Sequence, residues 1–496
     1  MKIHHILFCL LTLLIGCKPK TSDIRGEIKY SEKYRPQFHF TPEKNWINDP
    51  NGLVYYQGEY HLFYQYNPYG DKWGHMSWGH AVSKDLLHWE HLPSAIEEYL
   101  DPQTNDSTMI FSGTAVVDKN NTSGLCEGKD CLVAIYTSHL HKDNKGLRQH
   151  QSLAYSNDKG RTWKRYDKNP ILDIQRKDFR DPKVFWYEPQ QKWVMALVVP
   201  DVFKVQLYQS KDLLQWNLIS EFGKVGDTTR IWECPDLYQL PVENELGKTK
   251  WVLSLSGGHP AGSTFVGMQY FVGEFDGTTF TSSQTEAKYI DHGKDFYAGI
   301  VYNNVNDRTV MLGWVNNWTY ANQVPTSPWR GAFSLPRQLS LKNENDEYFL
   351  LQKTIDETKS LRGEDIKDLE KFTGASLEIE LEWSGADGTI VELFSNGDEK
   401  TTIVKRDNII SVNRAQSGIV NFQSDFASND QVSVDSSNQK LSLHIFVDQS
   451  IIEVFVNDGE ASITSQVFPR GENTIVIPMK ENIKNLKAWE LKSIWK

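Results

Sequence analysis

A carboxylate close to a proline, just ahead of an extended apolar run, recurs along this chain. It occurs at Asp49, Asp181 and Glu233, each two or fewer residues before a Pro. Recurrence of one local unit is typical of repeat architectures, in which equivalent positions occupy equivalent places in space. If the units surround one axis, the three acids converge at one end of it.

A second repeat is a Ser-x-Asp turn that ends in an aromatic residue. Copies lie at 83–89, 156–163 and 210–216, and a degenerate copy lies at 276–280. Asp side chains form such turns by hydrogen-bonding to the backbone that follows them, and the aromatic ring fills the gap between neighbouring sheets. We therefore expect these Asp residues to be structural rather than catalytic.

The repeats predict an all-β fold. Inner strands are expected to start near Asp49, Ser112, Asp181, Glu233 and Phe296, at intervals of roughly 50 to 70 residues that each hold about four strands. Five such units predict a five-bladed β-propeller over residues 30–350, in which the inner strands line a central channel.

The pattern changes near residue 350, where a charged, turn-rich link begins. Beyond it the segments 376–382, 441–447 and 451–456 alternate apolar and polar residues. One apolar face per strand is typical of two packed sheets. The pattern predicts a C-terminal β-sandwich over residues 365–496, without acid–proline units and with an accessory role.

The charge balance restricts the class of partner. The chain has 53 Lys and Arg against 64 Asp and Glu, a net charge of -11, and aromatic residues make up 12% of it. This balance argues against nucleic-acid binding, in which a basic surface supplies most of the affinity. A neutral polymer is an acceptable partner. Cys and His spacing shows no zinc motif, and we expect neither a metal nor a cofactor.

The N-terminus has the pattern of a targeting segment. An apolar stretch over 6–15 is too short to span a bilayer and ends at a Gly before Cys17. That ending resembles a bacterial lipobox, so residues 1–17 are predicted to be a lipoprotein signal peptide with Cys17 as the lipidated residue. The protein would be exported and held at a bacterial membrane by its lipid alone. A plain secretory signal is the alternative.

Apart from Cys9 and Cys17, which belong to the targeting segment, three cysteines remain. Cys126 and Cys131 flank a short loop and could form a disulfide in an oxidising compartment, which sequence alone does not decide. Cys234 is interpreted as a small buried residue rather than a nucleophile.

Converging carboxyls in a Trp- and Tyr-rich chain suggest cleavage of a glycosidic bond, which needs one ionised and one protonated carboxyl. Asp49 lies among Asn and Gly whose amides would keep it ionised, whereas the apolar neighbours of Glu233 would favour its proton. Asp181, beside Arg180, should stay ionised and stabilise a cationic transition state.

These motifs resemble glycoside hydrolase family 32, the invertase, inulinase and levanase group. The most specific stretches are WINDPNG at 46–52, FSG at 111–113, RDP at 180–182 and EC at 233–234. Supporting stretches lie at 65–68, 73–80, 295–298, 325–331 and, for the C-terminal domain, 448–459. The family's fold, a five-bladed propeller with a β-sandwich, agrees with the count above.

The resemblance implies a retaining mechanism and a role for each residue. Asp49 would be the nucleophile, Glu233 the general acid/base and Asp181 the transition-state stabiliser. The implied substrate-binding residues are Asn48, Gln65, Trp73, Ser112, Arg180 and Trp314, the last as an aromatic wall. The implied reaction is hydrolysis of β-fructofuranosidic bonds in levan or inulin, with sucrose as a further candidate.

Several functions remain open at this point. Exo release of fructose is favoured over endo cleavage of levan into oligosaccharides. A transfructosylase would use the same three acids with a sugar as acceptor. From another class, a catalytically silent fructan-binding lipoprotein would be indicated by loss of an acid, and the sequence retains all three.

Overall fold

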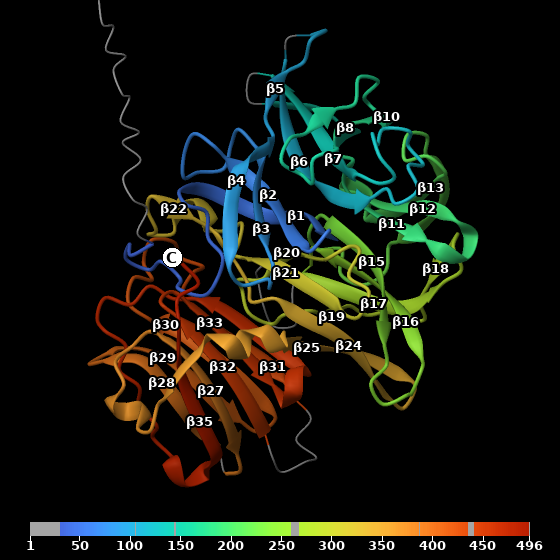
Figure 1. The fold of residues 1–496 in the computed structure, drawn as a ribbon. Coiled ribbons are helices and arrows are strands. Elements are labelled where there is room, and N and C mark those ends of the chain that lie inside the picture. Colours follow the sequence, from blue (N-terminus) through green and yellow to red (C-terminus); the bar gives the residue numbers. More distant parts are fainter. Residues whose placement is uncertain are drawn as a thin grey trace, which may run out of the picture.

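The computed structural model describes residues 30–104, 106–142, 145–258, 267–385, 387–434 and 441–495. Within them the chain is all-β, and its helices are single 3-10 turns or little more. Figure 1 shows strands from blue to red filling two adjoining bodies. The predicted signal peptide at 1–17, with Cys17, lies outside the described residues. Among the described helices, none is long and apolar enough to cross a membrane.

Residues 45–354, here called the N-terminal unit, form five sheets in chain order among the described residues. The first sheet contains β22 (Trp329–Arg330), β1 (Asn45–Tyr56), β2 (Glu59–Asn67), β3 (Ser77–Ser83) and β4 (Trp89–Ile96). The second contains β10 (Leu172–Arg176), β8 (Lys145–Ser156), β7 (Leu132–Lys142), β6 (Ser107–Val117) and β5 (Tyr99–Leu100), with β9 (Lys164–Arg165) paired to β8.

The other three sheets of the N-terminal unit are built in the same way, mostly from strands that pair with the next strand in the chain. The third contains β11 (Arg180–Tyr187), β12 (Lys192–Val199), β13 (Lys204–Ser210) and β14 (Asn217–Gly223). The fourth contains β15 (Glu233–Pro241), β16 (Thr249–Ser256), β17 (Met268–Phe275) and β18 (Phe280–Thr281), with β19 (Lys288–Tyr289) on β17. The fifth contains β20 (Tyr297–Val301), β21 (Thr309–Val315), β24 (Arg337–Glu344) and β25 (Glu347–Thr354), with β23 (Ala332–Phe333) on β21.

The first strands of these sheets form a closed ring. In the order β1, β6, β11, β15 and β20, each strand contacts the next, and β20 contacts β1. Two side chains tie the ring across its axis. Lys183 donates to the carbonyl of Val301 at 2.5 Å and pairs with Asp236 at 3.0 Å. Asn303 donates to the carbonyls of Ala115 and Val184. Radial sheets around one axis fit a propeller.

Residues 362–491, here called the C-terminal unit, form two sheets among the described residues. One contains β26 (Arg362–Asp365), β35 (Ile483–Leu491), β27 (Ser376–Trp383), β32 (Leu441–Asp448), β33 (Ile451–Val456) and β34 (Ala461–Gln466). The other contains β28 (Gly388–Asn396), β29 (Glu399–Arg406), β30 (Ile409–Gln416) and β31 (Asn429–Ser433). In β27 every second residue from Leu377 to Trp383 is buried, as a strand's alternation requires, and both sheets contribute to one apolar core.

Short 3-10 helices occupy several connections. They are η1 (Glu188–Gln190), η2 (Pro200–Val202), η3 (Ala321–Gln323), η4 (Asp356–Leu361), η5 (Leu369–Lys371), η6 (Asn457–Gly459) and η7 (Lys480–Asn482). The Ser-x-Asp repeats are turns, as predicted. Asp85 accepts hydrogen bonds from the backbone N–H groups of Leu87 and His88, and Asp212 does the same for Leu214 and Gln215. Cys126 and Cys131 form a disulfide.

A buried network of charges joins the two units. Arg337 of β24 pairs with Asp291 at 2.9 Å and with Glu453 of β33 at 2.5 Å. His39, ahead of β1, lies between Glu453 at 3.0 Å and Asp448 of β32 at 2.8 Å. The acids of the 448–459 stretch thus anchor the segment ahead of β1.

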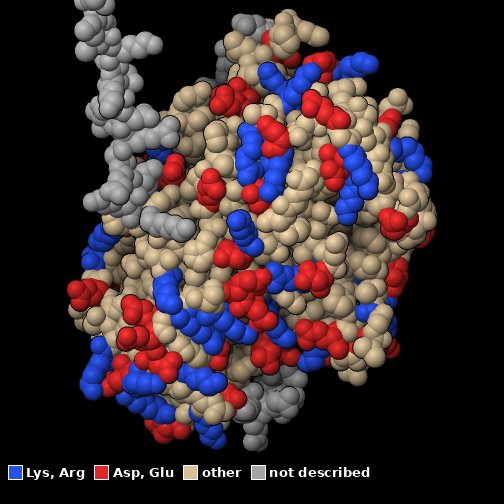
Figure 2. All heavy atoms as spheres, in the orientation of Figure 1, with Lys and Arg blue, Asp and Glu red and all other residues tan. Residues whose placement is uncertain are grey.

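Charge is mixed over the outer surface. On the face shown in Figure 2, Lys and Arg side chains lie interspersed with Asp and Glu over both units. With a net charge of -11, this face presents no broad basic surface of the kind that binds a polyanion.

Candidate active site

A β-bulge near the start of each inner strand shapes one end of the ring. The pairing with the next strand shifts register at equivalent places: 47–50, 110–113, 180–183, 233–236 and 297–300. A bulge bends its strand and re-aims the side chains that it carries. The acid–proline units therefore lie inside strands, at bulges, and not in turns ahead of strands as the sequence suggested.

The bulges bring the predicted acids into one pocket of about 510 Å³. Asp49, Asp181 and Glu233 all line it, as do the predicted Asn48, Gln65, Trp73, Ser112 and Arg180. Asp181 and Cys234 adopt left-handed φ values of 63° and 47° at their bulges. Non-glycine residues rarely hold this conformation, and where they do the surrounding structure enforces it.

Asp49 is buried and held by three donors. The Ser112 hydroxyl donates to Oδ2 at 2.6 Å, the Asn48 amide to Oδ1 at 3.0 Å, and the Cys234 thiol approaches Oδ2 at 3.6 Å. Asn48 is itself fixed by the Trp46 indole at 2.7 Å. These contacts fix the carboxylate in one orientation.

The charge on Asp49 is less favoured than the sequence suggested. Burial raises the pKa of Asp49, and the nearby Glu233 charge raises it further, while the bonds from Ser112, Asn48 and Cys234 oppose the rise. We expected the amides of an Asn-Gly turn to keep this group ionised. That reason was wrong, because the donors are side chains and desolvation outweighs them.

Asp181 lies deep beside the other acids. Its Oδ2 accepts the backbone N–H of Cys234 at 2.9 Å, and the nearest Arg180 nitrogen lies 3.8 Å away. Burial raises the pKa of Asp181 to about 7, with Arg180 opposing the rise and the charges of Glu233 and Asp49 adding to it. Arg180 alone therefore does not keep Asp181 ionised, contrary to our expectation.

Arg180 instead binds Glu233. Its Nε and Nη2 donate to Glu233 Oε1 at 3.2 and 3.1 Å, and Nη1 reaches Asp178 at 3.1 Å. The Tyr297 hydroxyl donates to Glu233 Oε2 at 2.7 Å. The prediction of apolar surroundings for Glu233 is wrong, because the Arg180 guanidinium and the Tyr297 hydroxyl donate hydrogen bonds to its two oxygens. Its side chain keeps 22% exposure, more than those of the other two acids.

The remaining predicted binding residues form the pocket wall. Gln65 lines the pocket and donates to the carbonyl of Ile110 at 2.9 Å. Trp73 is 41% exposed, its ring meets Phe111 edge-on, and its backbone N–H donates to the Asn322 side chain at 3.0 Å. An exposed indole at a pocket rim can stack on an apolar ligand face.

Trp314 does not form the predicted aromatic wall. It lies on β21, is fully buried and packs behind the pocket against Trp46 and Trp318. Trp318, four residues later, lines the pocket instead. The sequence offered two tryptophans in the segment 314–318, and only the turn after β21 decides which of them faces the ligand.

Sequence reasoning also missed several lining residues. They are Phe111, Arg230, Ile231, Tyr297, Trp318 and Asn322. Phe111 and Tyr297 lie within stretches singled out as motifs, so their position was a usable signal. Arg230 and Ile231 precede Glu233 in a loop, where no pattern indicates which side chains turn inward.

The loop that carries Trp318 and Asn322 is fixed from the C-terminal unit. The Tyr320 hydroxyl donates to Asp295 at 2.6 Å and accepts from Nη2 of Arg414, on β30, at 2.7 Å. Arg414 and Asp295 also form a buried ion pair. One residue beyond η3's start, Asn322 accepts from the backbone N–H of Trp73, so this segment also contacts the exposed tryptophan of the pocket.

A group with metal-binding atoms lies far from this pocket, in the C-terminal unit. Glu378, Glu380 and His444 bring ligand atoms within 4.8 Å of one another. The Arg362 guanidinium already occupies the cluster, 2.6 Å from Glu378 and 2.5 Å from Glu380. Because that cation neutralises the acids, we assign no metal to the group.

The pocket is equipped for acid–base chemistry with a carboxylate nucleophile. A buried, oriented carboxyl faces a more exposed one that an arginine and a tyrosine position, and a third acid completes the floor. Burial and neighbouring acids raise the pKa of the Cys234 thiol well above its usual value, so it stays a donor rather than a nucleophile. Carboxyls in unequal environments take unequal roles.

Comparison with known proteins gives two matches to family descriptions that together cover most of the chain. Residues 39–353 match the Glycosyl hydrolases family 32 N-terminal domain, and residues 341–490 match the Glycosyl hydrolases family 32 C terminal domain.

Individual relatives agree over almost the whole length. A levanase of Bacillus subtilis is 44% identical over 526 residues, covering 100% of this chain and 76% of the levanase. An extracellular exo-inulinase of Aspergillus niger is 40% identical over 500 residues, covering 90% of this chain and 92% of that protein. The crystal structure of exo-inulinase from Aspergillus awamori superposes with a TM-score of 0.86 at 37% identity, covering 94% of this chain and 100% of that one.

Proposed function

This chain belongs to glycosyl hydrolases family 32 and hydrolyses β-fructofuranosidic bonds of fructans and sucrose, and we propose that it does so by retaining double displacement with Asp49 as nucleophile and Glu233 as acid/base. The observation that carries the proposal is the meeting of Asp49, Asp181 and Glu233 in one pocket.

In the first step Asp49 attacks C2 of the terminal fructosyl unit while Glu233 gives its proton to the departing oxygen. The covalent ester forms as the glycosidic bond breaks, so charge balances. In the second step Glu233 takes a proton from water, whose oxygen replaces Asp49 at C2. Tyr297 and Arg180 hold Glu233 for both steps. Asp181 supports the cationic transition state when it is ionised.

Replacing either acting acid tests the proposal. Asp49→Asn and Glu233→Gln keep the size of each side chain and one acceptor oxygen, so we expect a folded protein whose kcat on inulin, levan and sucrose falls by a factor on the order of 10³ or more. Asp201→Asn, an exposed acid paired with Arg176, is the control. Near-normal turnover by either variant refutes the assignment. Immediate NMR detection of the β-anomer of fructose would establish retention.

We propose an exo mode, with one fructose released at a time from the chain end. Support comes from the pocket's volume of about 510 Å³, from the Lys183 and Asn303 side chains that cross the ring beyond it, and from similarity to exo-inulinases. A neighbouring hollow of about 530 Å³, reached past Trp73 and lined by Tyr69, His75 and His141, offers room for the rest of the chain.

Chromatography of early products separates the alternatives. Exo action gives fructose alone from levan and inulin, whereas an endo-levanase gives oligosaccharides first. A transfructosylase gives longer oligosaccharides at high sucrose. A silent fructan-binding protein gives no product, an outcome that would overturn hydrolysis altogether.

We also infer that the five sheets are blades of a five-bladed β-propeller and that the last two form a β-sandwich. The closed ring of inner strands and the shared core of the two C-terminal sheets support this reading. A crystal structure with a different number of sheets around the axis would contradict it. The bounds expected from the sequence, 30–350 and 365–496, are each a few residues short, because β25 runs to Thr354 and β26 starts at Arg362.

The protein is exported, as its similarity to extracellular relatives indicates. We propose that Cys17 carries a lipid anchor to a bacterial membrane, because its sequence context has the lipobox pattern. Cys17→Ser should move the enzyme from the membrane fraction to the soluble exported fraction, without changing its activity on sucrose. Unchanged membrane retention of the variant would eliminate the anchor.

A further inference from the structure

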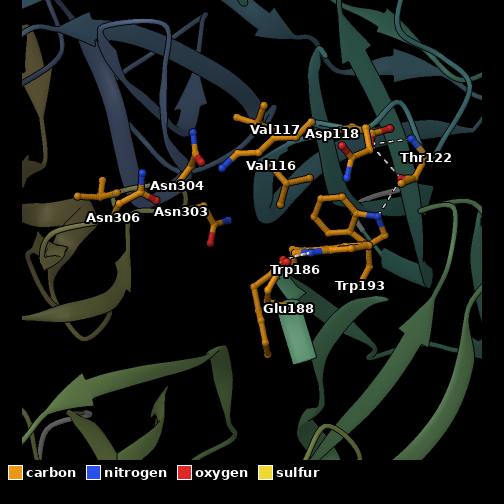
Figure 3. Close-up of a pocket in the computed structure, with 14 residues that line it drawn as sticks. Val116, Val117, Asp118, Thr122, Trp186, Glu188, Trp193, Asn303, Asn304 and Asn306 are labelled. Carbon is orange, nitrogen blue, oxygen red and sulfur yellow. Dashed lines mark hydrogen bonds between the residues drawn. The ribbon is translucent and has the colours of Figure 1, made fainter. Parts of the chain in front are cut away.

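Another hollow, distinct from the one beside Trp73, lies at the opposite end of the ring from the acids. Its volume is about 500 Å³. Its walls come from the end of β6, the end of β11 with η1, and the loop after β20, as Figure 3 shows. Asp181, in the active-site pocket, lies near the start of β11, and Trp186, in this hollow, lies near its end. At about 3.3 Å per residue, the pocket and the hollow are therefore roughly 17 Å apart.

Hydrogen bonds of Asn303 cross the ring at a level between this hollow and the active site. Asn303 donates through one amide nitrogen to Thr114 and Ala115 on β6 and to Val184 on β11. Its backbone N–H donates to Leu53 on β1. A ligand here is therefore separate from one held by the three acids.

An indole forms the platform of this hollow. Trp186 is half-buried, and its ring is locked by a hydrogen bond from Nε1 to Glu188 at 2.6 Å and by edge contact with Trp193 at 5.0 Å. Trp193 is held in turn by Thr122 at 2.9 Å. Figure 3 shows Trp186 edge-on below Trp193. A rigid, partly exposed indole suits the apolar face of a sugar ring.

Uncommitted polar groups surround the platform. Lys119, Asn120 and Asn306 are exposed, and their side chains make no hydrogen bond or ion pair with any described residue. Asn304 donates to the carbonyl of Tyr55 at 2.7 Å, which leaves its amide oxygen as an acceptor. Amides and an ammonium offer the mixed donors and acceptors that hydroxyl groups require.

We propose that this hollow is a non-catalytic binding site for fructosyl units of a fructan chain. The polymer is the substrate class of the family, and the hollow combines an aromatic face with neutral amides rather than with an acid pair. Its carboxylates are already engaged: Asp118 by Thr122 and Ser123, and Glu188 by Trp186 and Gln191. It therefore holds sugar and does not cleave it.

Binding at both ends of the ring tethers the enzyme to its polymer. A second contact raises the effective concentration of chain ends near the active site. Sucrose is too small to reach both hollows, so only polymeric substrates should benefit.

Affinity electrophoresis tests the site in the Glu233→Gln background, which does not digest the gel polymer. With sucrose added to fill the active site, migration through inulin or levan gels should still be retarded. Trp186→Ala in that background should weaken this retention about tenfold. Trp489→Ala, a half-buried tryptophan stacked on Arg362 in the C-terminal unit, is the matched control and should leave it unchanged.

Two further variants keep the test independent of folding. Lys119→Ala and Asn306→Ala remove side chains without described partners, so a loss of retention reports the site and not stability. With Glu233 intact, kcat/KM on sucrose should be unchanged while hydrolysis of dilute inulin or levan falls severalfold. The inference is overturned if sucrose alone abolishes retention, or if the variants migrate like their parent. Residual activity of the Glu233→Gln background would instead count against the proposed mechanism.

Discussion

Crowding of acids around Arg180 dominates the chemistry of single residues in the active site. Arg180 gives its hydrogen bonds to Glu233 and Asp178 and leaves Asp181 at 3.8 Å. Asp181 is therefore a buried acid whose pKa rises to about 7. Such a group costs stability when it ionises, because folding must bury its charge near other charges.

The Asp181→Asn substitution should lower the activity and raise the stability of the protein. The folded pKa, about 7, exceeds the ordinary 3.8, so the proton on Asp181 favours the fold below pH 3.8 and this benefit is lost as pH rises through 7. We expect the variant to melt at a higher temperature than the parent at pH 8, with the difference shrinking toward pH 3.8. Thermal melts across pH measure this. Asp178→Asn, at the half-buried neighbour that pairs with Arg180, should give no comparable gain.

Sequence predicted which acids meet, but not how they are held. The acids at 49, 181 and 233 stand in a repeated pattern, which a sequence displays directly. Bulges, by contrast, depend on pairing with the next strand. The sequence also does not show whether Trp314 or Trp318 lines the pocket, because the turn after β21 decides this. Nor does it show that Arg180 hydrogen-bonds to Glu233, because the two residues are far apart in the chain.

Among the elements, the loop leading into η3 links the C-terminal unit to substrate binding. Trp318 belongs to this loop and Asn322 to η3 itself, and Tyr320 between them bonds to Asp295 and Arg414. Arg414 also lies over the Phe426 ring at 4.0 Å. The C-terminal unit, expected from sequence to be accessory, therefore supports one wall of the pocket.

Tyr320→Phe should weaken substrate binding more than chemistry. The change removes one hydroxyl bonded to a buried ion pair and keeps the ring, so the wall loosens while the acids stay in place. We expect KM for fructan to rise about fivefold to tenfold, with a smaller change in kcat. Tyr136→Phe, whose buried hydroxyl has no described partner, is the control. A lower melting temperature with unchanged KM would show a purely structural role.

At the scale of the whole molecule, the buried charges between the two units determine the pH range in which these units pack stably against each other. Contacts to Asp448 and Glu453 outweigh burial and raise the pKa of His39 to about 9, and Arg337 and His39 outweigh burial and lower the pKa of Glu453 to about 2. At neutral pH the imidazolium donates to both acids, and Arg337 completes the charge balance.

The contribution of His39 should vanish in alkali. Because its folded pKa lies above the ordinary 6.5, its stabilisation is complete below pH 6.5 and is lost as pH rises through about 9. Glu453 behaves in the opposite sense: its contribution is present above pH 4.5 and lost as pH falls through about 2. Calorimetry should show a His39→Gln variant that is less stable at pH 6 and approaches the parent near pH 10. A constant difference across that range would exclude the titration, and exposed His88→Gln serves as reference.

From the cross-axis ties of Lys183 and Asn303 we infer that the reaction centre has a single opening. Free fructose must depart through the opening that admitted the polymer, so each departure delays the next arrival. Fructose should therefore be a competitive inhibitor, which raises KM for the substrate and leaves kcat unaltered. The polymer should dissociate between cleavage events rather than pass through the ring. Purely noncompetitive inhibition by fructose would indicate a second exit.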